Sequence, residues 1–98
     1  MTQYPADDVL LARGKYATVR SDVRKRTKEL HERMRAIADQ GRLLLQFDEE
    51  PQKAATVYAA MQRQVTETGD CLAHLAELEA ELNELRPLAW GDKEKPNE

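Results

Sequence analysis

Three side chains in the second half of the chain have the types and the spacing of metal ligands. Asp70, Cys71 and His74 project from one side when they lie on a helix. A thiolate and an imidazole at this spacing are ligands that zinc accepts. Two such ligands on one helix do not complete a site, however, and His31 or a second copy of the chain would have to supply the others. We therefore predict no metal site, with Cys71 half-buried and His74 on the surface.

The sequence shows no set of residues that would support catalysis. It has no phosphate-binding glycine loop, no HExxH motif, no Glu-x-x-His pair and no plausible Ser/His/Asp set. The glutamates of the second half lie in a solvated charge pattern, which gives no reason to expect a carboxylate tuned for acid-base chemistry. We predict that the protein is not an enzyme, and we predict no catalytic residue and no cofactor.

The most basic stretch of the sequence is VRKRTK, residues 23–28. It belongs to a rough stripe of cations on one predicted helix, formed by Arg13, Arg20, Arg24, Lys28, Arg35 and Arg42. Such a stripe can bind nucleic-acid phosphates. No aromatic side chains interleave with it, however, and no base-reading motif accompanies it. Nucleic acid is therefore the less favoured partner, and the alternative basic face consists of Arg20, Arg24, Lys28 and Arg35.

The same stretch has acidic neighbours that can neutralise it. The pairs at a spacing of four residues are Asp22 with Arg26, Lys25 with Glu29, and Lys28 with Glu32. We therefore interpret VRKRTK mainly as a solvated helix surface whose charges are paired within the protein.

Length and composition favour one helical domain. The chain has 98 residues, of which 34% are charged and 5% are aromatic, and its formal net charge is −3. This composition is typical of long helices or coiled coils rather than of an enzyme with a closed pocket. The sequence has no apolar run of membrane-spanning length, and its single cysteine cannot form an intramolecular disulfide. We expect a cytoplasmic protein that does not enter a membrane.

Prolines and apolar spacing divide the chain into two long helices. The first is predicted over about residues 6–47 and the second over about residues 51–86, where Pro87 disfavours further helical geometry. Residues 48–50 form a tight turn, because acidic residues followed by Pro51 combine a helix stop with a helix start. The fold class is therefore all-α, a single helical-hairpin domain over residues 1–90. The tail, residues 91–98, is too polar to pack and should be disordered.

Steps of three and four residues mark the inner face of each predicted helix, as in a coiled coil. In the first helix this face reads Ala12, Tyr16, Val19, Val23, Thr27, Leu30, Met34, Ile37, Gly41 and Leu44. Two successive steps of four around Val23 and Thr27 predict a stutter there. The apolar set of the second helix is Ala54, Val57, Tyr58, Met61, Val65, Leu72, Leu75, Leu78, Leu82 and Leu85.

A short turn makes the two helices antiparallel, so facing residues have numbers that sum to roughly 98 to 100. Arg33 then flanks Glu67, and Arg24 can reach Glu79. Each exposed pair contributes roughly 0.2 to 1 kcal/mol, which is too little to drive folding but enough to disfavour a shifted register.

Two further features bear on the architecture. Thr66 to Asp70 could end one helix at Gly69 and begin another, which would give a three-helix bundle as the alternative fold. The apolar faces are also broader than one hairpin can bury, because Leu43 and Leu45 widen the first helix and Tyr58 and Val65 widen the second. We therefore predict a homodimer in which two hairpins form a four-helix bundle.

Function is predicted at the level of a protein interaction module, of the adaptor, anti-activator or inhibitor type, that occludes or bridges a partner protein. A phage-type inhibitor of a nucleic-acid-handling defence complex is an alternative, because an acidic helix face can compete for a basic groove. The acidic candidates are Glu77, Glu79, Glu81 and Glu84. A second candidate patch, at the open end of the hairpin, contains Tyr4, Leu10 and Trp90, since aromatic residues often anchor protein interfaces.

Overall fold

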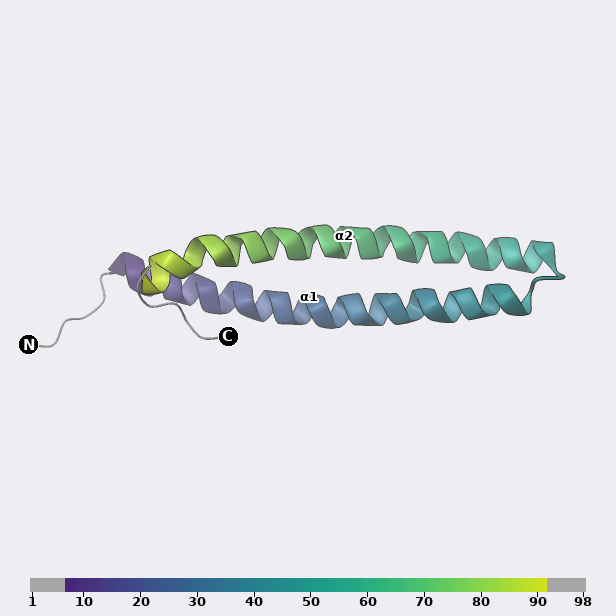
Figure 1. The fold of residues 1–98 in the computed structure, drawn as a ribbon, viewed down its shortest axis with the longest axis horizontal. Coiled ribbons are helices and arrows are strands. Elements are labelled where there is room, and N and C mark those ends of the chain that lie inside the picture. Colours follow the sequence, from purple (N-terminus) through teal and green to yellow (C-terminus); the bar gives the residue numbers. More distant parts are fainter. Residues whose placement is uncertain (1–6, 92–98) are drawn as a thin grey trace, which may run out of the picture. The chain divides into compact units, whose positions relative to one another are not determined.

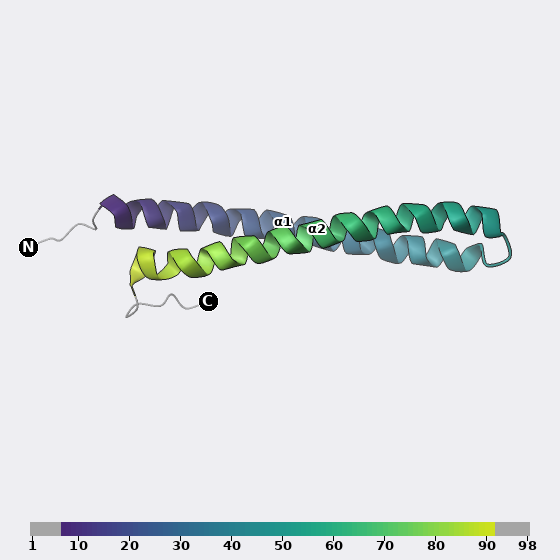
Figure 2. The same ribbon diagram turned by 90° about the horizontal axis from the view of Figure 1, so that it is seen from above.

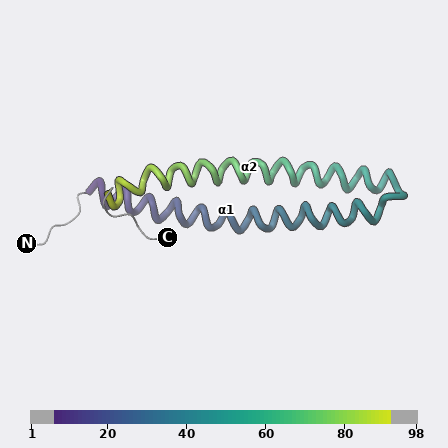
Figure 3. Tube along the Cα trace, viewed as in Figure 1, coloured from purple at the N-terminus to yellow at the C-terminus, as the bar shows by residue number. Residues whose placement is uncertain are grey.

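The computed structural model describes residues 7–91, and within them the chain forms two long helices joined by one turn. Helix α1 spans Asp7–Gln46 and helix α2 spans Pro51–Trp90. The chain doubles back once, and the two helices run antiparallel and in contact (Figures 1, 2 and 3). The expected all-α helical hairpin is therefore confirmed, whereas the expected tail lies outside the described residues apart from Gly91.

The turn between the helices has the chemistry that the sequence indicates. Phe47 donates its backbone N–H to the carbonyls of Leu43 and Leu44 at 3.1 and 3.2 Å, which closes α1. Glu50 then acts as the cap of α2, because its carbonyl accepts the N–H of Ala54 at 2.9 Å. Pro51 is the first helical residue, where its missing N–H costs nothing.

Helix α2 is continuous through Gly69, so the three-helix alternative is wrong. It also continues past Pro87 to Trp90, whereas the sequence predicted an end at Arg86. Proline removes one backbone hydrogen bond in a helix interior, but the residues beyond it here are packed: Ala89 is buried and Trp90 lies against the core. The helix finally ends at Gly91, whose φ of 77° and N–H bond to the Pro87 carbonyl at 2.7 Å are those of a glycine cap.

The seam, defined here as the row of inward-facing residues on each helix, follows an unbroken alternation of steps of three and four. On α1 its members are Val9, Ala12, Tyr16, Val19, Val23, Arg26, Leu30, Arg33, Ile37, Gln40 and Leu44, and Phe47 continues it just after the helix; all are buried or half-buried. On α2 they are Ala54, Val57, Met61, Gln64, Thr68, Cys71, Leu75, Leu78, Leu82, Leu85 and Ala89, again all buried or half-buried.

This seam corrects two expectations for α1. The predicted stutter is absent, because the seam passes through Arg26 and Arg33 instead of through Thr27 and Met34. Met34 is correspondingly exposed. Arginine can occupy such a position because its aliphatic stem covers apolar surface while its guanidinium reaches the edge of the helix pair.

Contacts between the helices divide the hairpin into two compact units. The open-end unit contains residues 7–25 and 75–91 of the described chain, and the turn unit contains residues 26–74. In the open-end unit the seam is apolar: Tyr16, Val19, Leu78 and Leu85 are buried together, and Val23, Leu82 and Trp90 pack against them. The Tyr16 and Trp90 rings meet edge to face, with centroids 4.8 Å apart.

In the turn unit the seam mixes apolar and polar residues. Leu30, Thr68 and Cys71 are the buried residues there, and Arg26, Arg33, Gln40 and Gln64 fill other inward positions. Thr68 satisfies its hydroxyl on the Gln64 carbonyl at 2.6 Å, and the Cys71 thiol lies 3.6 Å from the Arg26 carbonyl oxygen. Thr68 and Cys71 therefore replace large apolar side chains near the middle of the α2 seam.

Replacing Gln40 by Leu should stabilise the protein. Gln40 Oε1 is buried and accepts no hydrogen bond within the described residues, so the Gln40→Leu change removes an unsatisfied acceptor and adds apolar surface to the seam. We expect the free energy of unfolding, measured by urea titration, to rise by about 1 to 2 kcal/mol. Gln46→Leu, at an exposed position of the same helix, is the control and should change it by less than about 0.5 kcal/mol. Equal effects at both positions would contradict the assigned seam.

Candidate functional site

One flank of the turn unit is held by ion pairs. Arg33 donates to Glu29 Oε2 from Nε at 3.1 Å and to Glu67 Oε2 from Nη1 at 2.6 Å. Arg26 donates to the same Glu29 oxygen at 2.8 Å and, from Nε, to His74 Nδ1 at 2.8 Å. The cross-helix pair of Arg33 with Glu67 was predicted from the sequence and is confirmed.

The remaining predicted pairs are not formed among the described residues. Arg26 pairs with Glu29 rather than with Asp22, because both Arg26 and Arg33 occupy the seam and reach the carboxylate between them. Arg24 forms no ion pair with Glu79 in the described part of the chain. The internal neutralisation expected for VRKRTK is therefore seen at Arg26 alone.

The opposite flank of the turn unit carries no charge and exposes large apolar side chains. Glu29 and Glu67 immediately precede seam residues and lie together, since both bind Arg33. Residues that immediately follow seam positions therefore share the other flank. These residues are Thr27, Met34 and Gly41 on α1, and Tyr58, Val65 and Leu72 on α2. A shallow groove of about 600 Å³ lies between Tyr58, Met61, Gln62, Val65 and Thr66.

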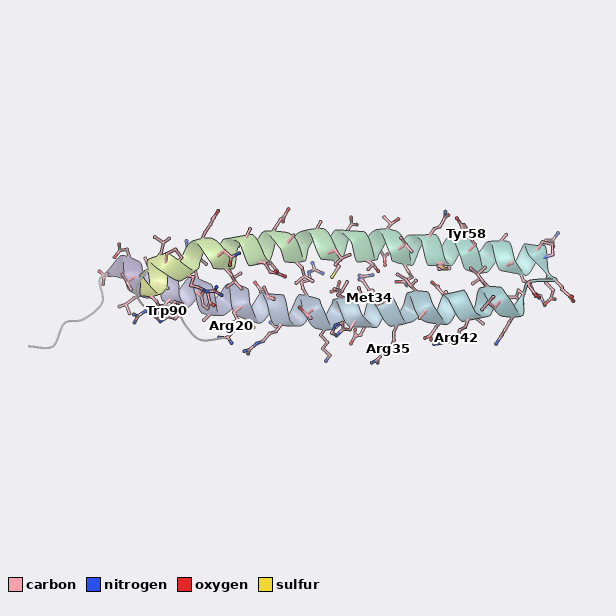
Figure 4. The ribbon with its side chains drawn as sticks, in the orientation of Figure 1. Arg20, Met34, Arg35, Arg42, Tyr58 and Trp90 are labelled. Atoms are coloured by element: carbon pink, nitrogen blue, oxygen red, sulfur yellow. The ribbon has the colours of Figure 1, made fainter. Side chains whose placement is uncertain are left out.

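We call this flank the uncharged face, and its outer rows extend it. The next residues outward are His31, Ala38 and Leu45 on α1, and Ala55, Gln62 and Gly69 on α2. Met34, Leu45, Tyr58, Val65 and Leu72 are between 46% and 76% exposed. Arg35 and Arg42 lie beyond the face, extending from α1 away from α2 (Figure 4). The sequence singled out Tyr58 and Val65 as residues that widen the apolar face of the second helix beyond what one hairpin can bury, and both are exposed.

The acidic residues proposed as a partner site lie on two sides of α2. Glu77, Glu81 and Glu84 follow one another at steps of four and three, so they form one exposed row. Glu81 lines a groove of about 590 Å³ together with Leu78 and Lys15. Glu79 instead lines a separate groove of about 400 Å³ with Leu82 and Arg20. The structure therefore brings three of the four together and separates Glu79 from them.

The candidate patch at the open end is also divided. Leu10 is exposed, as are Leu11 and Leu88, whereas Trp90 packs against the core of the open-end unit. Tyr4 lies outside the described residues. Trp90 thus closes the core, and the exposed leucines remain as the surface part of the patch.

The basic residues separate in a similar way. Arg20 and Arg24 line a groove of about 330 Å³ whose other residues are Arg13, Tyr16, Ala17, Ser21 and Trp90. Lys28 and Arg35 belong to the turn unit and are exposed outside the grooves described above. The sequence analysis missed the aromatic part of this site, because it ended α2 before Trp90. Continuing the seam steps from Leu82 and Leu85 to Ala89 would have carried the helix past Pro87.

The described residues were also compared with the requirements of a metal site and of a membrane-spanning helix. Within residues 7–91 there is no group of three or more His, Cys, Asp and Glu side chains placed to hold a metal ion. Cys71 is buried in the seam, and His74 is half-buried beside Arg26 rather than free on the surface. Neither of the two helices contains the uncharged apolar stretch that crossing a membrane requires.

Comparisons with known proteins do not indicate a function for the chain. No protein-family model matches the chain, and neither the curated proteins nor the solved structures gave a significant match.

Replacing Glu29 by Gln should destabilise the protein at neutral pH but not in acid. The hydrogen bond from Arg33 is the largest of the effects that hold the pKa of Glu29 below its usual value of 4.5. Because the folded pKa is the lower one, the stabilisation is fully present above about pH 4.5 and is lost as the pH falls through the folded pKa. Urea unfolding of wild type and Glu29→Gln from pH 7 down to about pH 2 should show a difference that shrinks to nothing.

Glu32→Gln is the matched control for this change. Glu32 is exposed on the same helix and forms no ion pair within the described residues. Its replacement should leave the free energy of unfolding nearly unchanged at pH 7. If Glu32→Gln destabilises the protein as much as Glu29→Gln does, the effect comes from the loss of a negative charge on the helix and not from the loss of the ion pairs with Arg26 and Arg33.

Proposed function

We propose that the protein is a non-enzymatic interaction module that forms a homodimer through the uncharged face of its turn unit. The observation that supports this proposal is the distribution of apolar and polar residues in that unit. Large apolar side chains stand outside the seam, while Arg26, Arg33, Gln40 and Gln64 occupy inward positions. A two-helix unit with this arrangement gains less from its own seam than the open-end unit does, and a further surface would bury the apolar side chains that it leaves exposed.

A second copy of the chain fits this face better than an unrelated surface does. The face has no charge to pair, so its partner must also be uncharged over a matching area. Two copies related by a two-fold axis meet this requirement automatically, because the same patch is presented twice. The small residues Ala38, Ala55 and Gly69 let helices approach closely, while Tyr58, Val65 and Leu72 supply the apolar area. The product is a four-helix bundle of two hairpins.

Dimerisation through the turn unit does not use the residues of the open-end unit. The row of Glu77, Glu81 and Glu84 and the exposed leucines Leu10, Leu11 and Leu88 all belong to that unit. An acidic row next to apolar side chains suits a basic protein surface, because charge steers the encounter and apolar contact supplies affinity. The dimer would then act as an adaptor or an inhibitor that covers such a surface.

Replacing Val65 by Glu should break the dimer without unfolding the hairpin. Val65 lies near the middle of the uncharged face and is half exposed in the single chain, so the change places an unpaired charge in the interface. We expect the dissociation constant to rise at least about a hundredfold. Light scattering on a size-exclusion column should give wild type twice the 11.2 kDa mass of one chain and give Val65→Glu the single mass.

Thr56→Glu provides the control, because Thr56 is exposed on the same helix of the turn unit but outside the uncharged face. This variant should remain dimeric, and both variants should keep the helical circular dichroism of wild type. A monomeric wild type at about 100 µM would overturn the proposal. Loss of the dimer in both variants would show that the interface lies elsewhere.

A further inference from the structure

The open-end unit carries a basic and aromatic groove that the sequence did not reveal. Its wall on α1 is formed by Arg13, Arg20 and Arg24, which span about 16 Å along the helix at ~1.5 Å per residue. Trp90, from the last turn of α2, lines the same groove, and the buried ring of Tyr16 lies beneath it. We call this the arginine groove. It joins a second groove that shares Tyr16, Arg20 and Arg24 and adds Arg86.

The arginines of this groove keep donors available for a ligand. Arg20 and Arg24 are exposed and form no ion pair with a carboxylate in the described chain. Arg13 donates Nε to the Ala89 carbonyl at 2.8 Å, which fixes its guanidinium and leaves the Nη donors. No carboxylate lines the arginine groove. In a protein of net charge −3, this is a local site for an anion rather than a result of general basicity.

The aromatic residues of the arginine groove indicate which class of anion fits it best. The Arg13 guanidinium lies 5.8 Å from the centre of the Trp90 ring, and Tyr16 meets Trp90 edge to face. Trp90 is therefore held in one position at the groove, where the residue is half-buried. A row of cations beside a flat aromatic ring is the combination that binds single-stranded nucleic acid, because the cations contact phosphates while a base stacks on the ring. A carboxylate partner would need the arginines but not the ring.

We propose that the arginine groove binds single-stranded nucleic acid, with Arg13, Arg20 and Arg24 on the phosphates and one base on Trp90. The groove is open and shallow, and it runs along α1, which suits an extended strand better than an enclosed small molecule. This assignment moves the basic site away from Lys28 and Arg35, which the sequence placed in the same face. It is independent of the dimer, since none of these residues lies in the turn unit.

The test is a titration with a labelled oligothymidylate of about twelve nucleotides, followed by anisotropy and by the fluorescence of Trp90, the single tryptophan of the chain. We expect binding at low salt that quenches Trp90 and weakens as salt rises, with a slope of about −0.7 for each phosphate contact. Absence of binding at about 25 mM salt would overturn the proposal. So would binding that leaves Trp90 fluorescence unchanged, or equal competition by polyglutamate or by a DNA duplex.

Charge-matched variants locate the site. The double change Arg20→Gln with Arg24→Gln should weaken binding about tenfold or more and should reduce the salt slope by about 1.4. Lys28→Gln with Arg35→Gln removes the same charge outside the groove and should weaken binding less than about threefold. All four side chains are exposed, so both variants should fold as wild type does. Equal losses in the two variants would mean diffuse attraction to the helix surface and would overturn the proposal.

Removing a carboxylate near the groove should strengthen binding, whereas removing arginines should weaken it. Glu79 lines the neighbouring groove with Arg20 and Arg24, where it opposes a phosphate, whereas Glu81 lies in a groove on another side of α2. Glu79→Gln should therefore strengthen binding about two- to threefold, while Glu81→Gln, with the same change in net charge, should leave it unchanged. A gain with Glu81→Gln equal to that with Glu79→Gln would contradict the assigned groove.

Discussion

The composition of the seam is the constraint on which the rest of the hairpin depends. Its spacing is uniform from Val9 to Phe47 and from Ala54 to Ala89, but its chemistry is not. In the open-end unit the seam buries Tyr16, Val19, Leu78 and Leu85, so that unit has an apolar core of its own. In the turn unit arginine, glutamine and threonine take many of the same positions. The two units therefore share the same seam spacing but differ in how much apolar surface their own seam buries.

The rotation of α1 about its axis determines both which polar residues enter the seam and which apolar residues stay exposed. Turning α1 by one residue would bury Thr27, Met34 and Gly41, as the simplest reading of apolar residues suggests. That rotation would bring two small or polar residues, Thr27 and Gly41, into the seam. In the observed rotation the cluster of Arg26, Arg33 and Glu29 on α1 is linked to α2 through Glu67 and His74. It leaves Met34, Tyr58 and Val65 exposed, where a partner can cover them.

Several features of the fold follow from the sequence because they depend on local chemistry. Pro51 after acidic residues marks the turn, and the short turn makes the helices antiparallel and sets the register that joins Arg33 to Glu67. Which residues of α1 face α2 could not be predicted in this way. A count of apolar residues ignores the aliphatic stem of an inward-facing arginine. The end of α2 was missed for a related reason. Proline has a local cost, whereas the burial of Ala89 and the packing of Trp90 against Tyr16 are contributions from the other helix.

The two proposed surfaces depend on different physics, which has a consequence for how they act together. The uncharged face is driven by apolar burial and is insensitive to salt, whereas the arginine groove is electrostatic and is weakened by salt. A homodimer carries the groove twice, so a strand long enough to reach both copies binds the second one as an intramolecular event. Affinity for long strands would then depend on the dimer, although the dimer interface contributes no residue to the groove. In the proposed dimer a modest groove of three arginines and one tryptophan would gain its strength from being duplicated, and the exposed apolar side chains of the turn unit would make duplication favourable.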